Sequence, residues 1–369
     1  MGNKIKVLFL TQTRQIGPAS RYRVYQYIDY LRVNGIECTL SPALPQSCYK
    51  FFYQNSNILK KILLLPLIVI KRIYDLSRVK KYDIVFIQRE ILPQIFPLFE
   101  ILISRIHKNI IFDFDDAIFL IPPQRNKLFY FLKDKQAIPR IISLSRQVIV
   151  GNDYLKEYAL QFNKQVELIP TAVDTQVWIK NVKSLNQSDR QALLGKEKII
   201  IGWIGTRHNL FYLEMLAPVF KQLAQKQAIC LHIISDAVFK SKDKYLDILN
   251  IAWDMNSEVA QVQKFDIAIA PLADDAWGRG KCGLKALQYM ACSIPTVCSA
   301  VGVYNQIIED GNNGFLAKNQ TEWLVKLTLL INDQKLRQNM GAAGRKTVEN
   351  NYSFEINKIK LKNIITQIK

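Results

Sequence analysis

Two places in the chain show the same order of features: a short apolar run, a glycine turn and a helical pattern. The first begins with Ile5–Leu10, passes through GPASRYR and continues into a predicted helix over Tyr22–Val33. The second begins with KIIIGWIG, which contains Gly202 and Gly205, and continues into an amphipathic helical pattern. A buried strand, a glycine turn and a helix in this order open a βα unit. Two such openings predict two doubly wound α/β domains.

Further apolar runs supply the other strands of both domains. They are Tyr82–Ile87, NIIFDFDD, Gln147–Val150 and Val166–Leu168 in the first half, and LHIISD, FDIAIAPL, PTVCSA and NGFLA in the second. A chain of 369 residues is long enough for two domains of ordinary size. We place these domains at residues 1–178 and 179–352. We expect the amphipathic helix over residues 353–369 to pack back on the N-terminal domain.

The formal net charge of +19 limits the partners. A strongly basic chain favours nucleic acid, an anionic membrane surface or phosphorylated substrates. Because the basic and aromatic residues form no compact nucleic-acid signature, we predict no nucleic-acid partner. Six cysteines without C-x-x-C spacing indicate buried thiols in a reducing compartment, and three dispersed histidines argue against a metal site. The N-terminal KIKVLFL lacks a cleavage site and no apolar run approaches a membrane span, so we expect a cytoplasmic protein.

Residues 57–81 combine apolar and basic character. The apolar run Ile62–Ile70 lies between Lys60–Lys61 and Lys71–Arg72, and the segment contains a single acidic residue. This pattern fits peripheral contact with an anionic membrane, here the inner face of the plasma membrane. A core helix with charged flanks is the alternative. Pro66 predicts two short helical pieces.

The segment Gly278–Pro295, GRGKCGLKALQYMACSIP, predicts a glycine loop that enters a helix. Arg279, Lys281 and Lys285 crowd the start of this helix without a carboxylate, although the N-terminus of a helix is already positive. A phosphate bound beside Gly283 would make this arrangement favourable. A solvated basic loop is the alternative.

The first βα opening also carries cations. Gly17 lets the backbone approach a ligand, and Arg21 and Arg23 lie where they would reach an anion at the helix N-terminus. Arg89 follows a predicted strand, at the end where α/β sheets place ligand-binding residues. These residues are candidates for an acceptor or phosphate loop. Solvated helix charges are the alternative for the first two arginines, and the dinucleotide fingerprint G-x-G-x-x-G is absent.

Three carboxylates end the predicted strand NIIFDFDD. Asp113 and Asp115 project to the same face, and Asp116 begins the loop. Carboxylates are costly to bury without partners, so they either form a site or pair with Arg89 or Arg125. The open roles are cation ligand, substrate-hydroxyl contact, base and loop cap. We favour the last two aspartates as catalytic residues.

Several segments give the chain a resemblance to a known family over essentially its whole length. They are KVLFLTQ with GPASRYRVYQYIDYLRVNGIE, LIPTAVDTQVW, IGWIGTRHNLFYLE and PLADDAWGRGKCGLKALQYMACSIPTVCSAVGVYNQIIEDGNNGFLA. The chain resembles the GT-B glycosyltransferases of family 4, the glycosyl transferases group 1 that build bacterial surface polysaccharides. The resemblance implies the GT-B fold, in which two Rossmann-like domains face a central cleft.

The resemblance also implies the reaction. A sugar passes from a nucleotide-sugar donor to a glycan or lipid-linked acceptor, usually with retention of configuration, in polysaccharide or glycolipid biosynthesis. The donor, a UDP-, GDP- or dTDP-sugar, is a co-substrate expected on the second domain, and no cofactor or metal is expected. The candidate donor-binding residues are Gly205, Thr206, Arg207, Lys281, Gly283, Lys285 and Gln288.

The chain departs from the family pattern at several positions. Gly280 and Gln288 stand where the family has paired glutamates, and Trp203 stands where it has an arginine that holds the pyrophosphate. The family's first-domain histidine is also absent, which gives more weight to Asp115 and Asp116. The alternative function is therefore a catalytically silent nucleotide-sugar-binding subunit of a polysaccharide assembly complex.

Overall fold

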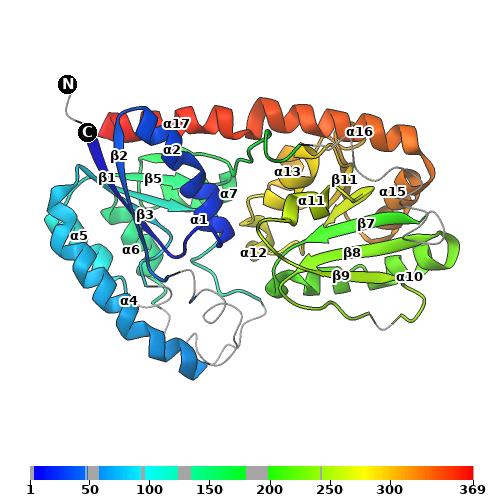
Figure 1. Cartoon of the computed structure of the whole chain (residues 1–369), viewed down its shortest axis with the longest axis horizontal. Coiled ribbons are helices and arrows are strands. Elements are labelled where there is room, and N and C mark those ends of the chain that lie inside the picture. Colours follow the sequence, from blue (N-terminus) through cyan, green and yellow to red (C-terminus); the bar gives the residue numbers. More distant parts are fainter. Residues whose placement is uncertain are drawn as a thin grey trace. The chain divides into compact units, whose positions relative to one another are not determined.

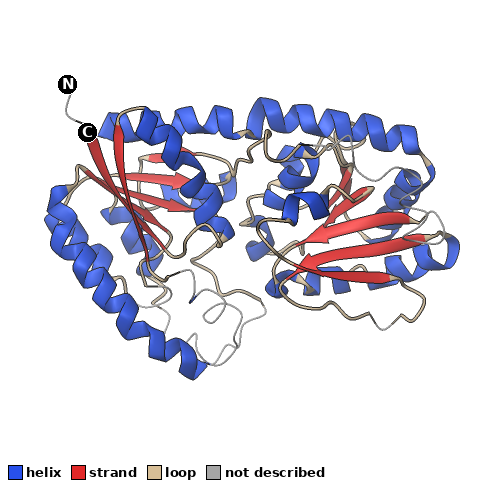
Figure 2. Ribbon diagram, viewed as in Figure 1, coloured by secondary structure: helices blue, strands red, loops and turns tan. Residues whose placement is uncertain are grey.

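The computed structural model (Figure 1) describes residues 4–45, 48, 58–92, 96–123, 134–179, 198–241 and 243–368, except for the side chains of residues 58–63. The chain forms two compact units. The first unit comprises Met1–Thr171, Gly280–Cys282 and Phe354–Lys369, and the second comprises Ala172–Arg279 and Gly283–Ser353. Figure 2 shows that each unit is a sheet flanked by helices.

The first unit is built on a six-stranded parallel sheet in the order β2-β1-β3-β4-β5-β6. Its strands are β1 (Ile5–Thr11), β2 (Ile36–Pro42), β3 (Ile84–Gln88), β4 (Ile110–Phe114), β5 (Gln147–Val150) and β6 (Val166–Leu168). Val7, Leu8, Phe9 and Leu10 are all buried, so β1 is covered on both faces. Continuous apolar runs of this kind are typical of parallel strands.

Helices cover this sheet on both faces (Figure 1). They are α1 (Pro18–Arg23), α2 (Ile28–Val33), α4 (Ile58–Arg78), α5 (Leu98–Ile106), α6 (Ala137–Leu144), α7 (Asp153–Leu160) and α17 (Phe354–Ile368). On one face, Leu31 of α2 and Leu361 and Ile365 of α17 join the same buried cluster as Val7 and Phe9. The C-terminal helix is therefore part of the hydrophobic core of the first unit.

Helix α4 shows that the prediction of two short helical pieces is wrong. It is one helix of 21 residues with Pro66 inside it. Because Pro66 is exposed, the carbonyl group that its missing N–H leaves free can bind water. Further along α4, the buried Arg72 donates to the carbonyl oxygens of Thr11 (2.9 Å) and Ser41 (3.0 Å), near the ends of β1 and β2. These bonds fix the helix on the sheet.

The second unit has a six-stranded parallel sheet in the order β12-β11-β10-β7-β8-β9. Its strands are β7 (Ile199–Ile204), β8 (Ile229–Ser235), β9 (Ile248–Ala252), β10 (Ile267–Ala270), β11 (Thr296–Ser299) and β12 (Phe315–Ala317). Its helices are α9 (Phe211–Glu214), α10 (Ala217–Lys226), α11 (Glu258–Val262), α12 (Ala276–Arg279), α13 (Leu284–Ala291), α14 (Tyr304–Ile307), α15 (Gln320–Asn332) and α16 (Gln334–Thr347). Phe220 of α10 and Leu327 of α15 lie in one buried cluster with Ile201 and Trp203 of β7. Two parallel sheets with flanking helices confirm the predicted α/β fold class.

Some local predictions differ from the structure. The predicted helix over Tyr22–Val33 is interrupted by a 3-10 turn at Tyr25–Tyr27 between α1 and α2. The strands β2 and β9 were not expected, because edge strands are partly exposed and lack a continuous apolar run. Within the described residues, no helix is long and apolar enough to cross a membrane.

Candidate functional site

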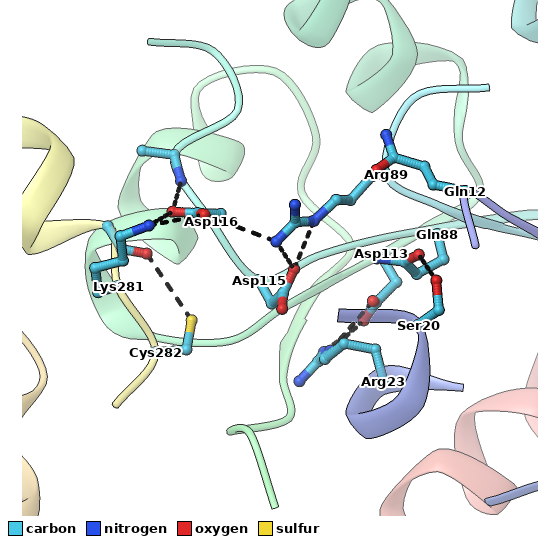
Figure 3. Close-up of polar contacts among 12 residues, drawn as sticks. Gln12, Ser20, Arg23, Gln88, Arg89, Asp113, Asp115, Asp116, Lys281 and Cys282 are labelled. Carbon is cyan, nitrogen blue, oxygen red and sulfur yellow. Dashed lines mark hydrogen bonds and ion pairs between the residues drawn. The ribbon is translucent and has the colours of Figure 1, made fainter. Parts of the chain in front are cut away.

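The candidate site of the first unit lies at the carboxyl ends of β3 and β4. These strands are parallel neighbours, and Gln88 pairs in register with Asp113. Asp115 and Asp116 directly follow β4, and Arg89 directly follows β3. The edge formed by the carboxyl ends of a parallel sheet is where open α/β folds bind ligands. Figure 3 shows the side chains that gather there.

Asp113 and Arg23 form a buried ion pair beneath this edge. Arg23 Nε donates to both Asp113 oxygens at 3.1 Å, and the Arg23 Nη2 group also contacts Oδ1. Arg23 Nη1 donates to the Ile169 carbonyl at 2.6 Å, and both charged side chains are almost fully buried. Arg23 therefore does not lie in an exposed anion-binding loop. Of the two arginines considered as partners of the three carboxylates, Arg89 pairs with Asp115 rather than with Asp113, and Arg125 lies outside the described residues.

Four charged side chains form a chain along the edge: Asp115, Arg89, Asp116 and Lys281. Arg89 contacts Asp115 Oδ1 through Nε at 2.8 Å and Nη2 at 2.7 Å, and its Nη2 lies 3.7 Å from Asp116 Oδ2. Lys281 Nζ lies 3.0 Å and 2.9 Å from the two Asp116 oxygens. The four side chains are between 14% and 22% exposed, so solvent screens them only in part. Alternating signs make this cluster neutral, and we call it the charge chain.

Arg89 has an unusual backbone conformation. Its φ of 58° lies in the left-handed region, which residues with a side chain rarely adopt. Its backbone N–H donates to the Asp113 carbonyl at 2.8 Å, which continues the β3–β4 pairing by one residue. This turn directs the guanidinium between the two aspartates, as Figure 3 shows.

The two aspartates of the charge chain differ in what their oxygens contact. Both Asp116 oxygens are bonded to Lys281, and Oδ1 also accepts from the Ala117 N–H at 3.2 Å. For Asp115, only Oδ1 has a hydrogen-bond partner among the described residues. Burial alone would raise the pKa of Asp115, but Arg89 and Arg23 outweigh it and hold that pKa below its usual value. Asp115 is therefore an anion with one oxygen to which no described residue donates a hydrogen bond.

Lys281 belongs to the first unit through the segment Gly280–Cys282. Its carbonyl accepts from Asn152 Nδ2 at 2.9 Å, and Cys282 packs against Gly151, where a Cβ would lie 2.3 Å from the sulfur. A Cβ at Gly280 would lie 2.5 Å from that of Ala117. A glutamate at this position would therefore displace its neighbours, so the glycine is needed in this arrangement.

Uncharged polar side chains line the same edge near Gly17. Ser20 Oγ donates to Gln88 Oε1 at 3.1 Å and bonds to Thr13 Oγ1 at 3.0 Å. Gln88 Nε2 is buried without a hydrogen-bond partner in the described part of the chain. The loop is tight, because a Cβ at Gly17 would lie 2.0 Å from Thr13 Oγ1. Arg21 lies with its guanidinium 4.8 Å from the centre of the Tyr22 ring. Ser20 was not predicted, whereas Gln88 lies directly before the predicted Arg89, at the strand end where ligand-binding residues are expected.

In the second unit, three of the predicted donor-binding residues, Gly283, Lys285 and Gln288, belong to α13 or its N-cap. Gly283 is the N-cap of α13 with a φ of 73°, and a Cβ there would lie 2.5 Å from Ile307 Cδ1, so glycine is required on both counts. Lys285 lies in the first turn, with Nζ 4.8 Å from the centre of the Trp203 ring. Gln288 lies one turn further and is 4% exposed.

Two of the predicted donor-binding cations are held by carboxylates. Arg207 bonds to Asp236 through its backbone N–H (2.6 Å) and Nε (3.0 Å), and Nη2 donates to the Asp236 carbonyl (3.2 Å). Thr206 precedes it as the N-cap of the short 3-10 segment Arg207–Asn209. Lys281 bonds to Asp116, as described above. In the part of the chain described, no group of three or more His, Cys, Asp or Glu side chains could hold a metal ion.

Comparisons with known proteins agree with this architecture. Residues 187–347 match the family model of glycosyl transferases group 1. A segment of 65 residues is 38% identical to an uncharacterized glycosyltransferase of Methanocaldococcus jannaschii, and it spans 17% of this chain and 18% of that protein.

Solved structures resemble the chain over nearly its whole length. A sucrose-phosphate synthase from Thermosynechococcus elongatus aligns over 99% of both chains with a TM-score of 0.71 and 14% identity. A glycosyltransferase from Rickettsia africae aligns over 99% of both chains, with a TM-score of 0.68 and 15% identity. The Anabaena protein HepE in complex with UDP aligns over 98% of this chain and 100% of its own, with a TM-score of 0.65 and 15% identity. The shared architecture confirms the predicted GT-B fold.

Proposed function

We propose that this chain, whose residues 187–347 match the family model of glycosyl transferases group 1, is an enzyme that transfers a sugar from a nucleotide-sugar donor to a hydroxyl group of an acceptor. The observation that carries the proposal is the charge chain at the carboxyl edge of the first sheet. It holds Asp115 as an anion with one oxygen available to a substrate.

The donor is a nucleoside diphosphate sugar bound by the second unit. The N–H groups at the start of α13 and the Lys285 ammonium supply positive charge for the diphosphate. Gln288 can hydrogen-bond a ribose hydroxyl, because its amide is both donor and acceptor. HepE has been solved with UDP and with UDP-glucose, which makes UDP-sugars the first donors to test.

The chemistry requires one bond to break and one to form. The bond between the anomeric carbon and the diphosphate oxygen breaks, and the acceptor oxygen bonds to that carbon. The acceptor proton passes to the departing diphosphate, whose charge Lys285 offsets. Asp115 is a weak base because its pKa is lowered, so it serves by accepting a hydrogen bond from a hydroxyl group of the acceptor. We further propose retention of configuration, which the anomeric proton of the product would reveal by NMR.

The proposed acceptor is a glycan or lipid-linked sugar of polysaccharide or glycolipid biosynthesis, reached at a membrane surface through α4. Leu67, Ile70, Ile73 and Tyr74 share one side of this helix and are between 55% and 63% exposed. Arg72 cannot contribute to this surface because it is buried with Asp75. The predicted cations at positions 60 and 61 lie outside the described side chains.

The membrane contact is tested with vesicles of phosphatidylglycerol. We expect Leu67→Ser combined with Ile70→Ser to reduce co-sedimentation several-fold, because each removes exposed apolar area. Val33→Ser is the matched control, since Val33 is 87% exposed on α2. Equal sedimentation of both variants would remove α4 as the contact.

Transfer itself is tested by incubating the protein with UDP-, GDP- and dTDP-sugars. Release of nucleoside diphosphate by wild type, and its loss in Asp115→Asn, would support the enzyme. The alternative is a catalytically silent nucleotide-sugar-binding subunit, which the absence of a carboxylate at Gly280 favours. Such a subunit would bind a nucleotide without releasing product from any sugar donor or acceptor tested. A protein that binds none of the nucleotides would contradict both functions.

A further inference from the structure

We propose that Trp203 is a positioning residue that holds the ammonium group of Lys285 ready for the diphosphate of the donor. This inference rests on the proposed function and deepens it, because it identifies which cation of the second unit binds the diphosphate and what orients it. Trp203 is the last residue but one of β7, and its side chain is 1% exposed. Lys285 Nζ lies 4.8 Å from the centre of its ring, within the range of a cation–π contact.

Gly205 packs closely against both residues of this contact. A Cβ at this position would lie 2.5 Å from Trp203 Cη2 and 3.0 Å from Lys285 Cε. The φ of Gly205 is not in the left-handed region, so the backbone conformation does not require glycine here. What requires glycine is the close approach of the lysine stem and the indole. The three residues therefore form one packed arrangement, which we call the Trp203–Lys285 clamp.

A second contact fixes the same two elements. Tyr289 lies four residues after Lys285 and therefore on the same side of α13. Its hydroxyl oxygen accepts from the Ile204 backbone N–H at 2.9 Å. The end of β7 is thus joined to α13 once through the buried Tyr289 and once through Lys285. Because both ends of the clamp belong to rigid elements, the ring and the ammonium group keep their relative position.

Charge explains why such positioning matters. A lysine in the first turn of a helix is repelled by the helix dipole and has many rotamers. The electron-rich ring face attracts the ammonium group, and the backbone N–H groups at the start of α13 also favour an anion. Arg207, the other cation predicted to bind the donor in this unit, forms an ion pair with Asp236. A diphosphate would therefore meet Lys285 already oriented, without the entropy cost of ordering its side chain.

The test measures binding of UDP and of uridine by calorimetry. Lys285→Met should weaken UDP binding about 10-fold or more, because it removes a charge-assisted contact to phosphate, and should leave uridine binding unchanged. Trp203→Leu should weaken UDP binding by a similar factor. Trp203→Phe keeps an aromatic face and should stay within about 3-fold of wild type. A loss that affects UDP but spares uridine marks a misplaced cation, since general damage to the fold would weaken both ligands.

The decisive measurement is the double variant. If Trp203 acts through Lys285, adding Trp203→Leu to the Lys285→Met variant should weaken UDP binding little further. If Trp203→Leu weakens UDP binding equally in both backgrounds, or if Trp203→Phe is as weak as Trp203→Leu, the clamp is refuted. The second result would instead point to the indole N–H, which is buried without a partner among the described residues.

Gly205→Ala provides a variant that keeps the buried indole. Its added Cβ meets Trp203 and the Lys285 stem, so UDP binding should weaken while uridine binding persists. Unchanged UDP affinity in this variant would contradict the clamp even if Trp203→Leu failed to fold. Failure of the proposed function has a different signature: wild type would bind none of UDP, GDP and dTDP.

Discussion

Lys281 Nζ lies 2.9 Å from Asp116 Oδ2, although 165 positions separate the two residues in the sequence. The pair closes one end of the charge chain, and Arg89 contacts the same aspartate from the other side at 3.7 Å. The side chains are only 22% and 15% exposed, so each charge depends on its partner more than a surface pair would.

We therefore predict that Asp116→Asn and Lys281→Met each reduce the free energy of unfolding by about 1–2 kcal/mol. The double variant should lose no more than the worse single variant, because removing both charges leaves none unpaired. Melting temperatures of the four proteins measure this coupling. Lys198→Met is the matched control, since Lys198 and Asp247 are 31% and 47% exposed and such a pair contributes about 0–1 kcal/mol. Additive losses in the double variant would show that the two residues act independently.

The unequal contacts of the two aspartates predict unequal effects on catalysis. Asp115 has an oxygen that is not bonded to the described residues, whereas both oxygens of Asp116 are occupied by Lys281. Asp115→Asn should lower kcat about 100-fold or more, because it removes the charge that faces the substrate. Asp116→Asn should lower kcat about 10-fold, because it disturbs only the partners that hold Asp115. The larger loss in Asp116→Asn would reverse these roles.

Arg89 determines the protonation of Asp115, so replacing it should change the pH dependence of transfer. Arg89→Met removes the strongest of the cationic influences that lower the pKa of Asp115, and burial then raises that pKa. The Asp115 carboxylate would then become protonated at a higher pH than in wild type. The acidic limb of the pH profile of kcat should therefore move upward by about 1–3 units.

Arg89→Lys is the matched variant for this test. A lysine keeps the positive charge but not the fork that contacts Asp115 through two nitrogens, so the acidic limb should move less. Methionine and lysine both carry a Cβ, so neither changes the cost of the left-handed φ of 58°. An acidic limb that stays at the wild-type pH in Arg89→Met would mean that Asp115 is not the group that titrates.

The strands that could be predicted from the sequence are mainly those that are buried on both faces of a sheet. The residues Val7 to Leu10 of β1 form a continuous apolar run, and the run itself identifies the strand. β9 lies at a sheet edge with no fully buried residue, so its sequence lacks this signal. Pro66 was misread because the sequence does not show that it lies on the exposed side of α4, where a missing hydrogen bond is tolerated.

The candidate-site residues that could be predicted are those whose location follows from their place directly after a strand. Asp115 and Asp116 follow a strand directly, so their place at the sheet edge followed from the pattern. The partners of charged residues could not be predicted, because pairing is decided by the packed fold. Arg23 bonds to Asp113 at a separation of 90 positions, and Lys281 belongs to the first unit although the segments before Gly280 and after Cys282 belong to the second. Net charge and spacing contain no information about such contacts.

Glu100 is a buried carboxyl group outside the site, and it predicts a pH dependence of stability. It is 3% exposed in the first turn of α5, and its Oε1 accepts from the Ile91 N–H at 2.8 Å. Burial raises its pKa to about 7. Between the ordinary pKa of a glutamate and this value, the folded protein binds more protons than the unfolded chain, so the free energy of unfolding falls as the pH rises.

Glu100→Gln keeps the oxygen that accepts from Ile91 and removes the ionisation. Urea unfolding at pH 5 and pH 8 gives the free energy of unfolding of the variant minus that of wild type. This difference should be about 2 kcal/mol larger, in favour of the variant, at pH 8 than at pH 5. Glu37→Gln is the control for the substitution itself, because it makes the same change of side chain at an exposed position. If the Glu100→Gln difference is the same at pH 5 and pH 8, the carboxyl group does not titrate in this range.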